Sequence, residues 1–119
     1  MKTHGPKREA EDWPRVHNYF LTDAAFEDLA AIADYGDENF GMKKSDEYQA
    51  KLKARFEQIA SSPLQYPAID EIRKNYRRSV LESHSIYFRI IDVHTVEIAR
   101  IIGRQKWQCL EISSLWRLQ

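Results

Sequence analysis

The sequence contains a single cysteine, Cys109, and no long apolar run. One cysteine excludes an intramolecular disulfide and gives no sign of secretion into an oxidising compartment. The first 20 residues hold charges without an apolar core, which excludes a signal peptide, and no later segment reaches the ~18 apolar residues of a membrane span. We therefore expect a soluble cytoplasmic protein, without membrane contacts, whose 119 residues form one domain around one core.

Net charge is also absent, because 18 basic residues balance 18 acidic ones. Strong direct binding to nucleic acid is not expected, since its affinity comes largely from neutralising phosphates. The charges are unevenly distributed: residues 22–62 carry nine acidic and five basic side chains, whereas residues 63–119 carry six acidic and nine basic ones. The second half can therefore present a local basic surface to an anionic or acidic partner.

Sequence motifs for common cofactors and metals are missing as well. There is no phosphate-binding loop, dinucleotide glycine fingerprint, cysteine pair or His-x-x-x-His pair. The four histidines are scattered, and no histidine follows His94 to activate Cys109 as a nucleophile. We expect no cofactor, no metal and no catalytic residue, and we interpret Cys109 as a small apolar contact.

Two amphipathic helices are expected in the first half of the chain. Thr22 is a suitable N-cap for the first helix, which Gly36 or Gly41 ends. The apolar residues that share one face of this helix are Phe26, Leu29, Ala33 and Phe40. The corresponding stripe on the second helix is Tyr48, Leu52, Phe56 and Ile59. A short glycine turn between the helices and closure of the second at Pro63 predict an antiparallel pair.

Short strands are expected where β-branched and aromatic residues concentrate, at residues 16–22, 77–81, 85–91 and 95–102. A three-residue loop at 92–94, with His94 in the left-handed conformation, predicts one register for the last hairpin. That register pairs Arg89 with Glu97, Ile90 with Val96 and Phe88 with Ile98. Strict alternation places Ile98 and Ile102 on one face, and Ala99 and Ile101 on the other.

These elements predict an α+β domain, in which an N-terminal strand and an antiparallel helix hairpin pack on a small, mostly antiparallel sheet. Residues 1–15 are polar and aperiodic and are expected to form an extension outside the core, and the domain covers residues 16–107. Residues 108–119 form a C-terminal extension. The apolar residues at helical spacing in it predict a short closing helix on the sheet, and they are Ile112, Leu115 and Trp116.

The candidate site is a set of cationic and aromatic residues in the basic half of the chain. The candidate target-binding residues are Arg78, Arg89, Arg100, Arg104, Lys106 and Trp107. Planar guanidinium donors beside an aromatic ring suit phosphate or carboxylate groups. The alternative is that Arg89 only pairs with Glu97 and that the other charges are ordinary solvated groups at strand ends.

The order of these segments resembles the RelE/ParE toxin superfamily and looks closest to its ParE branch. The resemblance covers residues 16–107 and rests on LTDAAFEDLAAIADY, on SSP after the second helix, and on IYFRIID followed by VEIARIIGRQ. Members of this superfamily are toxins of bacterial type II toxin–antitoxin pairs. The resemblance implies a cognate, ParD-like antitoxin, encoded beside the toxin, that covers an apolar groove next to the helices and sheet.

The RelE branch implies a ribosome-dependent ribonuclease that cleaves messenger RNA. Its arginines and lysines stabilise the transition state and, commonly, a Tyr or His near the C-terminus acts as acid or base. Here Ser85 and Gln105 stand where that branch has arginines, and residues 95–119 contain no Tyr or His. This alternative function would rest on the cationic and imidazole groups that remain: Lys43, Lys44, His84 and Arg104.

The ParE branch implies inhibition of DNA gyrase by binding, without side-chain catalysis. The residues that match this branch are Arg78, His84, Ile86, Phe88, Arg89, Ile90, Arg100, Gly103 and Arg104, while Ile102 stands where many relatives carry His. We therefore expect a non-catalytic gyrase inhibitor whose basic end contacts gyrase. A further alternative is a non-toxic family member that only binds its antitoxin.

Overall fold

The described part of the protein, residues 18–103 of a computed structural model, contains a short strand, two long helices and three further strands. In chain order the elements are β1 (Asn18–Leu21), α2 (Asp23–Phe40), α3 (Met42–Ser61), the 3-10 turn η1 (Pro63–Gln65), β2 (Arg77–Leu81), β3 (His84–Asp92) and β4 (Thr95–Gly103). The extension expected at 1–15, the start of the strand expected at 16–22 and the helix expected in 108–119 lie outside the described residues. Within residues 18–103 no helix combines the length and apolarity that a membrane span requires.

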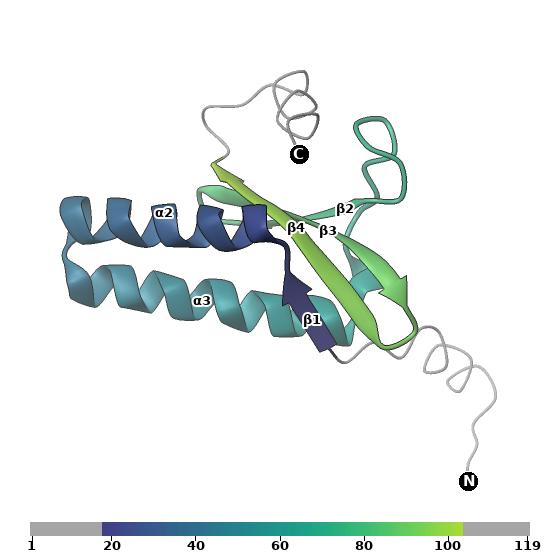
Figure 1. Ribbon diagram of the computed structural model, residues 1–119, viewed down its shortest axis with the longest axis horizontal. Coiled ribbons are helices and arrows are strands. Elements are labelled where there is room, and N and C mark those ends of the chain that lie inside the picture. Colours follow the sequence, from purple (N-terminus) through teal and green to yellow (C-terminus); the bar gives the residue numbers. More distant parts are fainter. Residues whose placement is uncertain (1–17, 104–119) are drawn as a thin grey trace, which may run out of the picture.

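A single sheet, in the strand order β1-β4-β3-β2, occupies the centre of the domain (Figure 1). β1 runs parallel to β4, whereas β2 with β3 and β3 with β4 are antiparallel. Parallel neighbours need a long connection, and here the helices lie within it. The predicted α+β domain, with an N-terminal strand, a helix hairpin and a mostly antiparallel sheet, is confirmed.

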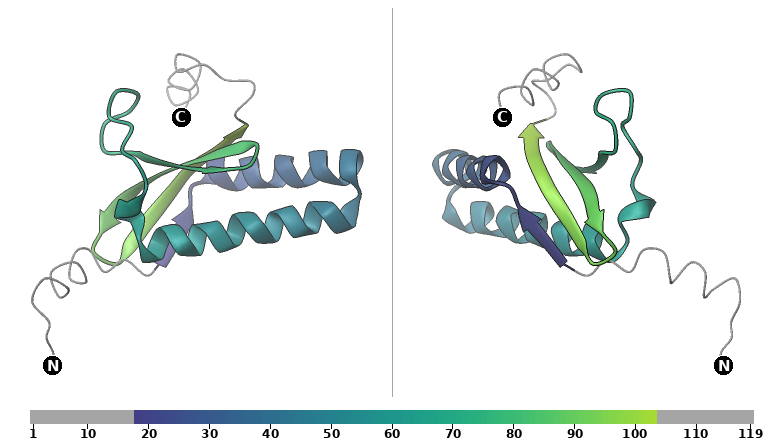
Figure 2. Two further views of the ribbon diagram at one scale, coloured as in Figure 1. Left: turned by 180° about the vertical axis from the view of Figure 1, so that it is seen from behind. Right: turned by 45° about the vertical axis from the view of Figure 1, so that its right-hand side comes forward.

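The helix hairpin lies against one face of the sheet (Figures 1 and 2), and α3 supplies most of its buried contact. The predicted stripe on α3 is confirmed, because Leu52, Phe56 and Ile59 are at most 1% exposed and Tyr48 packs against the same cluster. The sheet residues that these side chains meet are Ile86, Phe88, Val96, Ile98 and Ile101. Burial of this spaced apolar stripe explains why the segment folds as a helix on a sheet.

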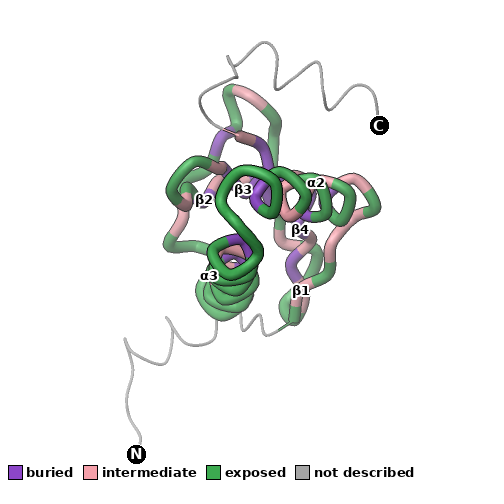
Figure 3. The backbone as a smooth tube through the Cα atoms, turned by 90° about the vertical axis from the view of Figure 1, so that its left-hand side faces the viewer, coloured by how far each residue is buried: buried purple, intermediate pink, exposed green. Residues whose placement is uncertain are grey.

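The stripe predicted for α2 is wrong at its two aromatic positions, since Phe26 is 66% and Phe40 is 62% exposed. The residues that α2 buries are Ala25, Leu29 and Gly36. The glycine lets α2 approach α3 closely, because a Cβ added to Gly36 would lie 2.7 Å from Ser45 Oγ. The turn end of the hairpin also projects past the sheet in Figure 1, and Figure 3 shows mostly exposed residues at that end.

The boundaries of the helices follow the predicted capping residues. The Thr22 hydroxyl accepts a hydrogen bond from the Ala25 amide at 3.0 Å, which confirms Thr22 as the N-cap of α2. The same hydroxyl donates to the carbonyl oxygen of Ala99 at 2.9 Å and so ties the start of α2 to β4. Gly41 ends α2 with a φ of 89°, a conformation that glycine adopts without steric cost.

The second face of the sheet is covered by the connection between η1 and β2. Ile69 and Tyr76 from this connection form a second buried cluster with Tyr87, Ala99 and Ile102. A register shift in the pairing of β3 with β4 makes this possible, because Phe88 pairs with Ile98 while Tyr87 pairs with Arg100. Ala99 is the extra residue of this bulge.

The bulge overturns the strict alternation expected for β4. Ile98 and Ile101 both belong to the cluster beneath the helices, whereas Ala99 and Ile102 belong to the cluster on the opposite face. The inserted residue shifts the side-chain alternation by one position. Both faces of the sheet are therefore packed against other parts of the chain.

The final hairpin has the predicted register and a different turn. Arg89 pairs with Glu97, Ile90 with Val96 and Phe88 with Ile98, as the sequence indicates. The three-residue loop is wrong, because Asp92 pairs with Thr95 and a second register shift lies between Ile90 and Asp92. The Asp92 carboxylate accepts a hydrogen bond from the His94 amide at 2.8 Å, and His94 is not among the described non-glycine residues with positive φ. The Asp92 side chain thus stabilises a turn that is shorter than the predicted three-residue loop, although the turn contains no glycine.

Candidate binding site

Arg100 is held by α2. Its Nε and Nη2 atoms donate to the two carboxylate oxygens of Asp28 at 2.7 and 2.9 Å. The Arg100 side chain is 15% exposed and that of Asp28 is 16% exposed. The Ile101 amide donates to the same carboxylate at 2.9 Å. Asp28 raises the pKa of the Arg100 guanidinium above its ordinary value through this hydrogen bond. The predicted target-binding role of Arg100 therefore competes with a structural one.

Arg89 and Arg78 lie on neighbouring strands. The Arg89 Nε donates to the Glu97 carboxylate at 2.7 Å, and its guanidinium lies 5.7 Å from the centre of the Tyr76 ring. Arg78 is half-buried in β2 opposite Tyr87, and its amide donates to the carbonyl oxygen of Pro67 at 3.1 Å. Arg104, Lys106 and Trp107 lie outside the described residues, so the described part of the chain contains only three of the six predicted residues, Arg78, Arg89 and Arg100.

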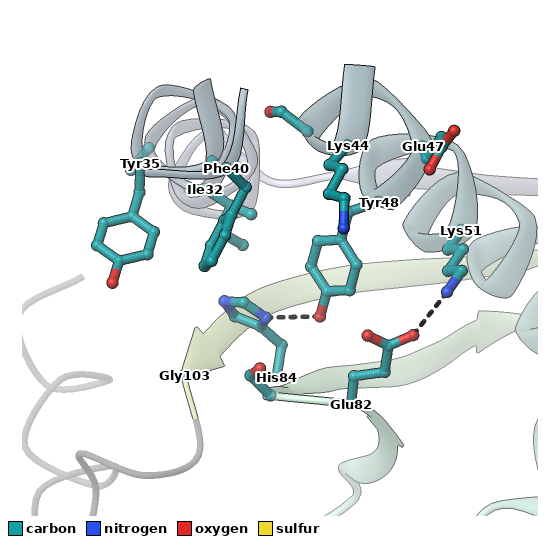
Figure 4. Close-up of a pocket in the computed structure, with 14 residues that line it drawn as sticks. Ile32, Tyr35, Phe40, Lys44, Glu47, Tyr48, Lys51, Glu82, His84 and Gly103 are labelled. Carbon is teal, nitrogen blue, oxygen red and sulfur yellow. Dashed lines mark hydrogen bonds and ion pairs between the residues drawn. The ribbon is translucent and has the colours of Figure 1, made fainter. Parts of the chain in front are cut away.

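An open groove of about 700 Å³ lies between the helix hairpin, the β2–β3 turn and the end of β4 (Figure 4). Its volume falls within the range of ~300–1,000 Å³ that is usual for ligand pockets. The lining residues used below are Ile32, Tyr35, Phe40, Tyr48, His84 and Gly103. Three elements that are far apart in the sequence therefore form a single concave surface.

One wall of the groove is aromatic and open to solvent. The Tyr35 and Phe40 rings pack edge to face with their centres 6.1 Å apart, and each side chain is 62% exposed. The sequence placed Phe40 in the core and did not single out Tyr35. Their separation of five residues along α2 is not the spacing of a shared helix face, so helical periodicity gave no signal for this aromatic wall.

A hydrogen-bonded pair forms the floor of the groove. The Tyr48 hydroxyl lies 2.7 Å from Nδ1 of His84 and 3.1 Å from the carbonyl oxygen of Leu81. A phenol has one hydrogen, so both bonds form together only if Tyr48 donates to Leu81 and His84 donates from Nδ1. The remaining ring nitrogen of His84, Nε2, is then an acceptor, and Figure 4 shows the other ring nitrogen directed toward Ile32 and Phe40.

Burial shifts both members of this pair toward their neutral forms. Desolvation lowers the pKa of His84, and the nearby charge of Asp28 opposes this shift. Desolvation and the negative charge of Glu82 raise the pKa of Tyr48 to about 12. At neutral pH the floor of the groove is therefore uncharged and suits an apolar or hydrogen-bonding partner better than an ion.

Charged groups lie at the rim of the groove. Lys51 and Glu82 form an exposed ion pair at 2.9 Å, and Lys44 and Glu47 line the same rim. Of the residues considered for RNA cleavage, Lys44 and His84 line the groove, Lys43 is not among its lining residues, and Arg104 lies outside the described part. Within residues 18–103 no three acidic, histidine or cysteine side chains gather as metal ligands.

The arrangement of a strand, a helix hairpin and an antiparallel meander defines an α+β fold shared with a solved structure described as the chromosomal ParDE TA system from P. aeruginosa. The TM-score is 0.65 at 21% identity, over 75% of this chain and 96% of that chain.

Sequence similarity identifies the family. The family model described as the ParE toxin of type II toxin–antitoxin system, parDE, matches residues 19–106. Toxin ParE1 of Mycobacterium tuberculosis is 29% identical over 87 residues, which are 73% of this chain and 89% of the relative. Toxin ParE1 of Caulobacter vibrioides is 31% identical over 84 residues, which are 71% of this chain and 85% of the relative. The chain belongs to the ParE toxin family of type II toxin–antitoxin systems.

Proposed function

We propose that this toxin inhibits DNA gyrase in the cytoplasm by binding to it, without catalysing a reaction, and that a cognate ParD-like antitoxin neutralises it. The observation that carries the proposal is the ParE family match over residues 19–106, which includes α2, α3 and strands β2 to β4. The similar P. aeruginosa structure is described as a ParDE system, which supports an antitoxin of the ParD type as the partner.

The basic residues of the second half are the proposed contacts with gyrase. Arg78 and Arg89 lie on β2 and β3, and we group them with Arg104, Lys106 and Trp107 as the target-binding surface. Arg89 retains 44% side-chain exposure despite its bond to Glu97, so part of its guanidinium remains accessible to a partner. Arg100 contributes to this surface by holding α2 on β4, since Asp28 occupies its donors.

The groove is the proposed contact with the antitoxin. Its exposed aromatic wall and uncharged floor suit the apolar face of an antitoxin segment. Peptide segments commonly bind in such grooves through a few apolar anchors. A reading frame next to that of the toxin, encoding a small acidic protein with a ribbon-helix-helix start, is the expected genetic companion.

A supercoiling assay with purified gyrase tests the proposal. The protein is expected to inhibit supercoiling, and Arg78→Ala to raise the concentration for half-inhibition roughly tenfold, as loss of a central interface residue does. Lys53→Ala is the matched control, because Lys53 is an exposed cation on α3 outside the groove lining. Absence of inhibition at a large excess over gyrase contradicts the proposal, as does equal weakening by both variants.

RNA cleavage remains the second candidate because Lys44 and His84 share the groove. The pure protein added to translating ribosomes is expected to leave messenger RNA intact. Cut messenger ends that disappear with His84→Ala would favour the ribonuclease. In cells, induction is expected to cause filamentation and a DNA damage response. Translation arrest would again favour cleavage, and unaffected growth would favour a non-toxic protein that only binds its antitoxin.

A further inference from the structure

The groove lacks a cover among the described residues. Tyr35 and Phe40 remain 62% exposed, although burying an aromatic side chain is strongly favourable. Exposed apolar patches of this kind generally mark sites where another segment binds. Neither face of the sheet is open to bind a further segment, because the helices cover one face and the connection before β2 covers the other.

The chain itself leaves the sheet at this groove. β4 ends at Gly103, which is one of the groove-lining residues, and Figure 4 shows it on the side where Tyr35 and Phe40 project. Residues 104–119 follow it in the sequence. Four extended residues reach up to ~14 Å, and Gly103 already lines the groove, so the segment from Trp107 onward starts within reach of the groove.

The sequence of this segment suits the wall. Leu115 and Trp116 follow Ile112 by three and four residues, a spacing typical of sequences that form an amphipathic helix. The ParE family match ends at residue 106, so the segment 107–119 lies beyond the part that this chain shares with the family model. Its apolar residues are therefore not explained by the family fold.

The charge of the neighbouring helix favours the approach of this segment, whereas the charged residues that line the groove itself are balanced, with Lys44 and Lys51 against Glu47 and Glu82. Helix α2 contains six acidic residues and no basic residue, whereas residues 104–119 contain three basic residues and one acidic residue. Opposite charges on two segments steer them together and disfavour alternative placements.

We infer that residues 107–119 of this chain dock in the groove and place Ile112, Leu115 and Trp116 against the aromatic wall of Tyr35 and Phe40. The toxin thereby covers its own proposed antitoxin site. The docking itself does not depend on the proposed function, whereas its regulatory consequence does. A partner that needs the groove must displace the segment, so its apparent affinity is reduced by the fraction of molecules in which the groove is open.

Tryptophan fluorescence tests the docking directly, because the three tryptophans, Trp13, Trp107 and Trp116, all lie outside the described domain. In full-length protein carrying Trp13→Phe and Trp107→Phe, Trp116 is the sole emitter. It is expected to emit at shorter wavelength than free tryptophan and to be protected from acrylamide quenching. Phe40→Ser should lower the ratio of docked to undocked molecules roughly threefold to tenfold, which raises quenching.

Phe26→Ser is the matched control for Phe40→Ser. Phe26 lies on the same helix and is 66% exposed, but it does not line the groove. Circular dichroism checks that both variants remain folded. A solvent-like Trp116 in the parent protein overturns the inference, and so does protection that Phe40→Ser leaves unchanged or that Phe26→Ser reduces equally.

The regulatory consequence is tested with the antitoxin. Leu115→Ser with Trp116→Ser in the full chain should tighten antitoxin binding several-fold by opening the groove. Unchanged antitoxin affinity overturns the regulatory consequence even if the fluorescence result holds. Loss of gyrase inhibition by the parent protein, in contrast, contradicts the proposed function and leaves the docking result unaffected.

Discussion

Replacing Asp28 with alanine should destabilise the protein more than any comparable change at the surface. The carboxylate accepts three hydrogen bonds, two from Arg100 and one from the Ile101 amide, and it does so while 16% exposed. Hydrogen bonds to charged groups contribute about 1.5–3 kcal/mol, and breaking a buried ion pair costs about 3–5 kcal/mol. Because the pair is not fully buried, we expect Asp28→Ala to cost about 3 kcal/mol.

Arg100→Met should cost less, about 2 kcal/mol, because the methionine retains much of the apolar packing and Asp28 keeps its bond to the Ile101 amide. The double variant is expected to cost about 3 kcal/mol as well, since the bonds between the two side chains can be lost only once. The resulting coupling energy, about 2 kcal/mol, measures the contact between α2 and β4.

Urea denaturation of the four proteins, followed by circular dichroism, gives these values when the slopes of the transitions agree. The exposed pair of Lys51 and Glu82 provides the control cycle, for which no measurable coupling is expected. If the double variant costs as much free energy of unfolding as the two single variants added together, the structural role of Arg100 is refuted. In that case, any effect of Arg100→Met on gyrase inhibition would have to come from direct contact with the target.

Three further predictions concern stability. Thr22→Ala should cost about 1–2 kcal/mol in urea denaturation, because it removes the cap of α2 and the bond to β4, and Thr22→Ser should restore most of it. Gly36→Ala should lower the free energy of unfolding by about 1–2 kcal/mol, and with it the melting temperature, despite the better helix propensity of alanine, since its Cβ would lie 2.7 Å from Ser45 Oγ. A raised melting temperature would contradict this close packing. Stability should fall as pH drops from about 6.5 through the folded pKa of His84, because burial lowers that pKa and the unfolded chain binds the proton first. His84→Gln should reduce the dependence of the free energy of unfolding on pH in this range. An unchanged dependence would show that other groups cause it.

Local patterns predicted much of the fold. The bounds of β2 are those expected at 77–81, and the register of the last hairpin follows from matching one charge pair and two apolar pairs. The cap at Thr22 and the stripe of α3 were also predictable, because capping and helical periodicity depend on residues within a few positions of each other. The turn was missed because the Asp92 side chain can replace the left-handed residue as its stabiliser.

The candidate site was much less predictable. Phe40 has the spacing of a core residue, and its exposure depends on how far the hairpin projects past the sheet. Arginine is a residue type typical of binding surfaces, so Arg100 was predicted to bind a target. Its actual partner, Asp28, is 72 positions away in the sequence, and no local pattern indicates that pairing. Sequence patterns indicate what a side chain can do, whereas its actual partner depends on the packing of whole elements.

The sequence by itself determined the elements, their caps, the pairing of the last two strands and, through resemblance, the toxin family. Only the tertiary structure decided which residues are free to bind. Ala99 forms a bulge in β4, and Tyr48 of α3 forms a hydrogen bond with His84 of β3. One aromatic wall is also left open. These features arise from contacts between segments far apart in the chain, and short-range periodicity carries no information about such contacts.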